Sequence, residues 1–153
     1  MTPRSLIVLT LVLTTTMAAA PAVAQAPPPN PVDPHIADGS AQAALDKARA
    51  RWKALKIRSY DYEVRRTCFC PTSSWKVIRV RGSSPSKGST AVAKDLATVP
   101  RLHRVIRQAI DAKAHRLEVN YGARGVPTQI SVDSIQYLAD EEQYLSIRRF
   151  KRR

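Results

Sequence analysis

Apolar residues recur at helical spacing in two parts of this 153-residue chain. Between 41 and 55, Leu45, Ala48 and Trp52 share one face of a helical projection, and basic side chains occupy the other. Ser40 precedes this stretch and has a side chain suited to N-capping. The pattern predicts an amphipathic helix over about 41–55, with Trp52 as its anchor in the core.

The second helical stretch has the clearest amphipathic pattern in the chain. Its apolar residues are Leu102, Val105, Ile106, Ala109 and Ile110, spaced i, i+3, i+4, i+7 and i+8. Thr98 stands just before this stretch and is a suitable N-cap. We therefore expect a second helix over about 99–113.

Alternation of apolar and polar residues predicts five β-strands. They span about 59–69, 75–81, 115–121, 128–133 and 144–150. Short connections imply antiparallel pairing, and the Gly/Ser-rich segment 82–90 predicts a flexible loop. The element order α-β-β-α-β-β-β gives an α+β fold, with two helices on one face of a mainly antiparallel sheet of about five strands.

The N-terminal 26 residues have the pattern of a cleaved signal peptide, with Arg4, an apolar stretch and small residues at the cleavage site. The apolar stretch is diluted by threonine and too short for a membrane span. Residues 27–39 hold five prolines and predict a disordered linker before a single domain over 40–153. No cysteine stands at the cleavage site for lipid attachment. We expect a periplasmic or secreted protein with no transmembrane segment in its mature chain.

The formal net charge of +13 creates a positive field that attracts polyanions. Three arginines recur at i, i+3 and i+6 on the second helix, and the C-terminal tail is basic. The polyanion-binding candidates are Arg101, Arg104, Arg107, Arg148, Arg149, Lys151, Arg152 and Arg153. The alternative is a solvated arginine-rich surface that keeps the protein soluble. Nucleic acid is not favoured as the partner, because the aromatic residues are expected in the core.

An acidic group stands out near the C-terminus: Asp133, Asp140, Glu141 and Glu142. Such carboxylates suit a hard cation such as calcium, or the acid–base pair of a small hydrolase, although their spacing does not match an EF-hand. The alternative is that they end a strand and pair with nearby arginines. No catalytic residue is assigned and no cofactor is predicted. If the acidic group binds an ion, calcium is the ion that we expect.

The chain has two cysteines, Cys68 and Cys70. An oxidising compartment permits a disulfide between them. Residues spaced i, i+2 in a strand lie roughly 6.6 Å apart, near the upper limit for a bridge. A bridge therefore needs a local kink, and Pro71 marks a place where the chain leaves the strand. We expect an intramolecular disulfide rather than free thiols or a metal site.

Two groups of residues resemble the domain of unknown function family 6174. The first comprises Trp52, Tyr60-Asp61-Tyr62 and Cys68-Phe69-Cys70-Pro71, and the second runs from Tyr121 to the closing strand that ends at Phe150. The resemblance covers about 41–150 and implies one domain of a secreted or lipid-anchored bacterial protein. It implies no activity, because the family carries no established one.

These observations favour a non-catalytic, macromolecule-binding domain in the cell envelope. The simplest partner is another protein, which the sequence does not identify. The alternatives are an envelope polyanion bound by the arginine-rich face, and a small carboxylate-dependent hydrolase.

Overall fold

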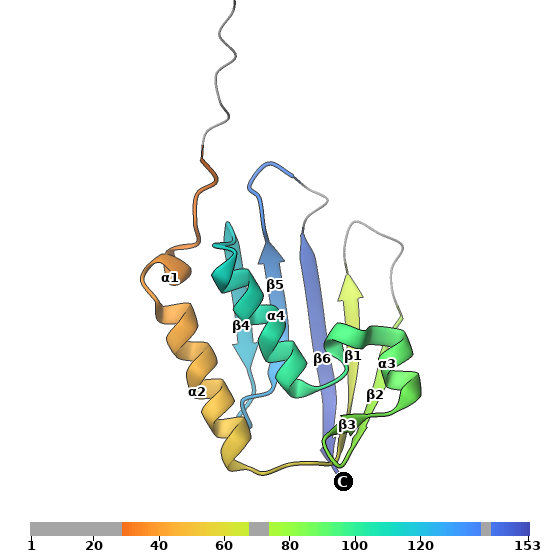
Figure 1. Cartoon of the computed structure of the whole chain (residues 1–153). Helices are drawn as coiled ribbons and strands as arrows, with labels where there is room; N and C mark the ends of the chain where they lie inside the picture. The colour runs from red at the N-terminus through yellow and green to blue at the C-terminus, as the bar shows by residue number, and fades with distance from the viewer. Residues whose placement is uncertain (1–28, 68–73, 139–141) are drawn as a thin grey trace, which may run out of the picture.

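The computed structural model describes residues 29–67, 74–138 and 142–153, and in these residues helices cover one face of an antiparallel sheet (Figure 1). The helices are α1 (Pro34–Ala37), α2 (Ser40–Ala54), α3 (Lys87–Ala93), the 3-10 helix η1 (Lys94–Leu96) and α4 (Val99–Asp111). The strands are β1 (Tyr60–Thr67), β2 (Lys76–Arg81), β3 (Ser84–Pro85), β4 (Arg116–Tyr121), β5 (Pro127–Asp133) and β6 (Gln143–Arg152). The predicted α+β class and the two main helices are confirmed.

The sheet has the order β3-β2-β1-β6-β5-β4, and every neighbouring pair is antiparallel. The last strand therefore lies between the β1–β2 hairpin and the β4–β5 hairpin.

A bulge interrupts the pairing of β6 with β1, where Asp61 faces Lys151 but Glu63 faces Arg148. Arg149 has a φ of 53° at this bulge. The extra residue shifts the alternation of β6, so that Phe150 faces the helices together with Leu145 and Ile147.

The core lies between the sheet and the helices. Tyr60, Tyr62 and Val64 of β1 are buried on the helix side, whereas Asp61 and Glu63 point to the uncovered face. The main helices complete this core with fully buried residues, which include Leu45 of α2 and Leu102 and Ile106 of α4. This burial fixes which flank of each helix stays exposed.

An aromatic cluster closes one end of the core. The ring of Trp52 meets those of Tyr60 and Phe150 edge-on, with centroids 5.1 and 5.8 Å away. The Tyr60 hydroxyl accepts a hydrogen bond from the Val99 amide, at 3.0 Å. The Tyr62 hydroxyl donates to the Leu96 carbonyl, and burial raises the pKa of this tyrosine. Trp52 is thus an anchor, as predicted, and the cluster holds the end of α2 and the start of α4 against the sheet.

Two local predictions for helix starts and loops were wrong. Segment 82–90 is not a flexible loop, because it contains β3 and the start of α3, which Ser86 caps by accepting from the Ser89 amide. Ser40 is the first residue of α2 rather than its N-cap. Gly39 takes the cap position with a φ of 78°, a conformation that glycine adopts readily.

The predicted disordered linker also differs from the structure over residues 33–39. Asp33 is 5% exposed, and its carboxylate accepts from the amides of His35 (2.7 Å) and Leu117 (2.8 Å). Its own amide donates to the Ala114 carbonyl, and α1 follows directly. Proline content alone could not reveal partners about 80 residues away. The predicted signal peptide, residues 1–26, lies outside the described residues.

Candidate anion-binding cleft

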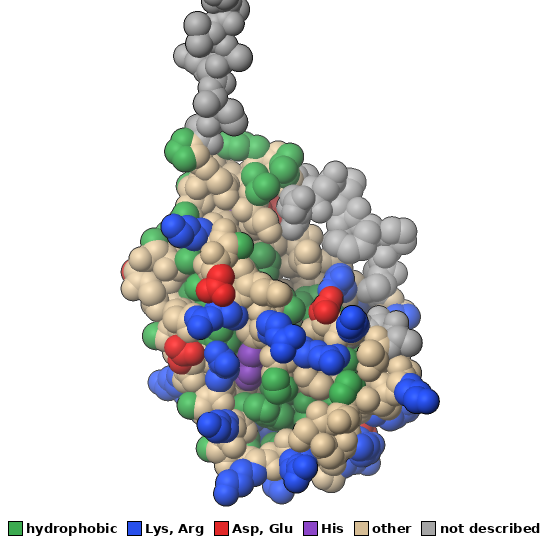
Figure 2. All heavy atoms as spheres, viewed as in Figure 1, with side chains coloured by type: hydrophobic (Ala, Val, Ile, Leu, Met, Phe, Trp, Pro, Cys, Tyr) green, Lys and Arg blue, Asp and Glu red, His purple; other side chains and the backbone are tan. Residues whose placement is uncertain are grey.

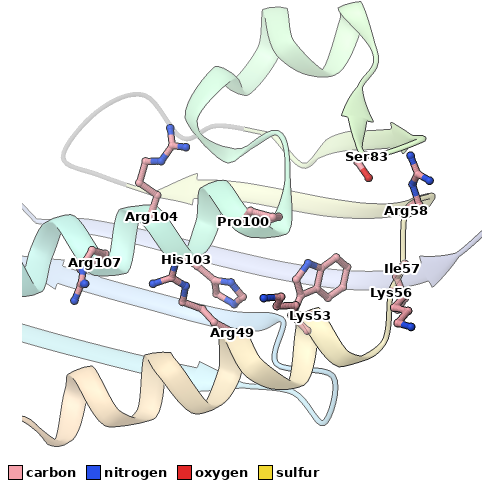
Figure 3. A pocket seen from close by; sticks show the side chains of 11 residues that line it. Arg49, Lys53, Lys56, Ile57, Arg58, Ser83, Pro100, His103, Arg104 and Arg107 are labelled. Carbon is pink, nitrogen blue, oxygen red and sulfur yellow. The ribbon is translucent and has the colours of Figure 1, made fainter.

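A cleft with a volume of about 880 Å³ lies between α2 and α4 (Figure 3). Trp52, Ile57 and Pro100 form its apolar part, and His103 lines it as well. Its cations are Arg49, Lys53, Lys56, Arg58, Arg104 and Arg107, and no acidic side chain of the described residues lines it. Lys and Arg side chains likewise predominate over acidic ones on the helix-covered face (Figure 2).

Helix geometry explains why these cations gather. Arg49 and Lys53 lie one turn apart on α2, and Arg104 and Arg107 lie one turn apart on α4. The apolar stripes of both helices pack on the sheet, so their basic flanks border the groove between them. Lys56 follows the end of α2 and continues its basic row. The cleft is therefore a product of helix packing rather than of one local motif.

Most of these cations have no carboxylate partner in the part of the chain that the structure describes. Within the described residues, no ion pair joins Lys53, Lys56, Arg58 or Arg104 to a carboxylate. The other two cations form long ion pairs on their own helices. Arg49 is 3.9 Å from Asp46, and Arg107 is 3.7 Å from Asp111. Arg107 also donates to the Gln42 side chain. The cleft thus presents positive charge that a ligand could neutralise.

His103 is a buried polar residue in this basic lining, only 4% exposed. Its Nε2 lies 2.8 Å from the Gly125 carbonyl. A carbonyl only accepts, so Nε2 carries the proton and the neutral ring keeps an unprotonated Nδ1. Burial lowers the pKa of His103 and the nearby Arg49 lowers it further, against an opposing effect of the Gly125 hydrogen bond. The lowered pKa favours the neutral form of His103 at pH 7.

The predicted polyanion-binding arginines of the second helix do not all line the cleft. Arg104 and Arg107 line the cleft, whereas Arg101 donates to the Lys94 carbonyl at 2.7 Å and lines a separate hollow. The sequence analysis missed Arg49, Lys53, Lys56, Arg58 and His103 as site residues. The basic residues that recur on one face of the first helix could have indicated a binding surface. Nothing in the sequence shows, however, that this face borders the second helix.

Arg148, Arg149 and Arg153 lie on the uncovered face of the sheet, whereas the helix arginines lie on its other side. Arg148 and Arg149 bind opposite oxygens of Glu63, at 2.8 and 2.9 Å, and Arg153 binds Asp61 at 2.7 Å. Hydrogen bonds from Arg81 and Arg153 hold the pKa of Asp61 below its usual range, and those from Arg148 and Arg149 do so for Glu63. Lys151 lies beside Asp61 and Glu63 on this face, and Arg152, opposite Tyr60, is exposed at the end of β6. Three of the tail arginines are thus paired with carboxylates within the molecule.

The predicted acidic group is only partly within the described residues, since Asp140 and Glu141 lie outside them. Asp133 accepts from the Ile135 amide at 3.2 Å, and Glu142 accepts from the Tyr144 hydroxyl at 2.8 Å. Among the residues that the structure describes, no group of three or more His, Cys, Asp or Glu side chains is placed to hold a metal ion. Calcium binding stays a prediction. The predicted disulfide partners Cys68 and Cys70 also lie outside the described residues.

Comparison with known families gives a match over residues 44–152 to a family model described as "Family of unknown function (DUF6174)". The chain belongs to this family. The matched segment of this DUF6174 domain holds all six strands and both walls of the cleft, apart from the start of α2. Comparisons with curated proteins and with solved structures found no match. Within the described part of the chain, no helix has the length and hydrophobicity needed to cross a bilayer.

Proposed function

We propose that this domain binds an anionic polymer of the cell envelope through the cleft between α2 and α4, and that binding rather than catalysis is its function. The observation that carries the proposal is the set of six cleft cations, with no acidic residue among the described residues that line the cleft. Like charges held together repel one another and destabilise the fold. A polyanion relieves this repulsion and releases its own counterions on binding.

The spacing of the cations supports a linear ligand. Arg49 and Lys53 are separated by about 6 Å along α2, and Arg104 and Arg107 by about 4.5 Å along α4, at 1.5 Å per residue. Two basic rows along an open groove suit a chain whose anionic groups repeat at a similar distance. The predicted signal peptide supports an encounter with such polymers in the envelope.

Nucleic acid is not the polymer that we favour. Non-specific single-strand binding relies on aromatic platforms on which successive bases stack. The aromatic residue of the cleft, Trp52, is half-buried and packs edge-on against Tyr60 and Phe150. The sulfated or phosphorylated chains of envelope polymers need no such platform.

The test uses fluorescently labelled dextran sulfate and anisotropy measured at rising salt. Replacing Lys53, Lys56 and Arg58 by Gln is expected to weaken binding more than about tenfold at low salt and to reduce the salt slope. The matched control replaces Arg79, Arg149 and Lys151 by Gln, which removes the same charge from the uncovered face of the sheet. This control is expected to retain most of the affinity.

The two triple variants separate a local site from a general charge effect. Equal loss of affinity in both would show that net charge attracts the probe and that the cleft is not the site. No binding of the unsubstituted protein at about 50 mM salt would contradict polyanion binding altogether. Thermal melting of each variant checks that its fold is unchanged.

A further inference from the structure

We infer that anion binding in this cleft is coupled to the uptake of one proton by His103, whose Nδ1–H then donates to an anionic oxygen of the ligand. This inference rests on the proposed function and deepens it. It makes His103 the residue that sets the pH range in which the polymer is held.

The position of His103 carries the inference. The ring is 4% exposed yet lines the cleft, and its Nε2–H is committed to the Gly125 carbonyl at 2.8 Å. Nδ1 is therefore the ring nitrogen left for a ligand. In the neutral ring Nδ1 is an acceptor, and an acceptor facing an anionic oxygen is repelled by it. In the imidazolium ring both nitrogens donate, so the charged form suits an anion and the neutral form does not.

The surroundings of the ring determine which form the empty cleft favours. From α2, Arg49 and Lys53 face the same cleft, and from α4 itself Arg104 and Arg107 do so (Figure 3). The turn between β4 and β5 contributes the carbonyl of Gly125. No carboxylate lines this cleft among the described residues. Cations and burial therefore keep the ring neutral until a ligand arrives.

A bound anionic polymer favours the protonated ring of His103 over the neutral one. Its charges offset those of the neighbouring arginines and lysine, so the penalty on a positive ring falls and a charge-assisted hydrogen bond from Nδ1 becomes available. Because the bound state holds one more proton than the separate partners, binding strengthens as pH falls. For one proton, the affinity changes at most about tenfold per pH unit, between the His103 pKa values of the empty and occupied cleft.

The experiment measures the dissociation constant for dextran sulfate from pH 5.5 to 8 at constant salt. Sulfate esters do not titrate in this range, and lysine and arginine stay charged, so histidine is the side chain that can follow the pH. We expect binding to weaken several-fold from the acidic to the basic end. Calorimetry in buffers of different ionisation enthalpy is expected to report uptake of up to one proton per cleft occupied.

Two variants assign the proton. In His103→Gln, the side-chain amide can still donate to the Gly125 carbonyl but cannot titrate, so the affinity is expected to lose its pH dependence. The matched control is His115→Gln, at a histidine that contacts the Pro31 carbonyl at 3.0 Å outside the cleft. This control is expected to keep the full pH dependence. If His103→Gln fails to fold, NMR titration of the His103 ring in the unsubstituted protein, with and without dextran sulfate, replaces it.

The outcomes keep the two proposals apart. Binding that is independent of pH, the same pH dependence in His103→Gln, or a His103 pKa that dextran sulfate does not raise would overturn the proton coupling and leave the cleft as a polyanion site. Absence of binding at low salt and pH 6 would overturn both.

Discussion

The Nε2 atom of His103 lies 2.8 Å from the carbonyl oxygen of Gly125, and this contact joins α4 to the turn between β4 and β5. The same glycine lies against α2, where a Cβ atom on it would come within 2.1 Å of the Ala48 carbonyl oxygen. Three elements thus meet at one residue without a side chain. Their close approach sets the separation of the two helices that wall the cleft.

The first prediction is that Gly125→Ala destabilises the protein strongly. The new methyl group would collide with the backbone of Ala48, and the φ of 75° is itself unfavourable for alanine. We expect the free energy of unfolding to fall by more than about 2 kcal/mol, measured by chemical denaturation. Gly88→Ala is the control, because nothing lies within 4 Å of its Cβ position in α3. It should leave stability unchanged or raise it by up to about 1 kcal/mol. Equal stability of the two variants would contradict this account.

The second prediction concerns Asp33, whose carboxylate holds the segment before α2 on the start of β4. Asp33→Ala leaves the amides of His35 and Leu117 without their acceptor, so we expect a loss of about 1–3 kcal/mol in the free energy of unfolding. Hydrogen exchange at the Leu117 amide should quicken as well. Asp46→Ala, at an exposed site on α2, should change stability by less than about 0.5 kcal/mol. Unchanged protection of Leu117 would show that this contact does not hold the segment in solution.

The third prediction is that Thr98→Ala shortens or weakens α4. The Thr98 hydroxyl accepts from the Arg101 amide at 3.2 Å and so satisfies a donor in the first turn of α4. We expect a loss of about 1 kcal/mol in the free energy of unfolding. Thr98→Ser keeps the capping oxygen and should recover most of that loss. A serine variant as unstable as the alanine variant would point to the methyl group instead of the cap.

The fourth prediction links Glu63 to stability in acid. Its hydrogen bonds to Arg148 and Arg149 lower the pKa of this carboxyl in the folded state. Its contribution is therefore present above the unfolded pKa of about 4.3 and is lost as pH falls through the lower folded value. Melting temperatures from pH 7 to pH 3 at low salt should fall less steeply in Glu63→Gln than in the unsubstituted protein. Asp46→Asn, at a weaker pair, should follow the unsubstituted curve, and a Glu63→Gln curve of unchanged slope would contradict the assignment.

Local patterns were sufficient for much of the fold. The apolar spacing from Leu102 to Ile110 predicted α4, and Thr98 caps it as expected, because both signals lie within a few residues. The alternation from Tyr60 to Val64 predicted which side of β1 is buried. Ser86 and the short β3 were missed because a Gly/Ser-rich composition resembles a loop until the neighbouring strand β2 is in place.

The candidate site was predicted only in part, and the reason is visible in β6. A bulge at Arg149 shifts the alternation, so Phe150 joins the aromatic cluster while Arg148 and Arg149 both reach Glu63. The sequence shows basic residues in this tail but neither the bulge nor the acids opposite. The tail therefore looked like a binding surface, although three of its arginines are paired with Glu63 and Asp61.

By itself, the sequence determined the α+β class, the two main helices, the alternation of the strands and the excess of positive charge. All of these follow from the spacing of residues close together in the chain. The tertiary structure decided which charges remain available: it paired three tail arginines with Asp61 and Glu63, and it brought Lys53, Arg58 and Arg104 to one cleft with His103. Those neighbours are some 50 to 90 residues apart, and only the packing of two helices and the insertion of β6 into the sheet bring them together.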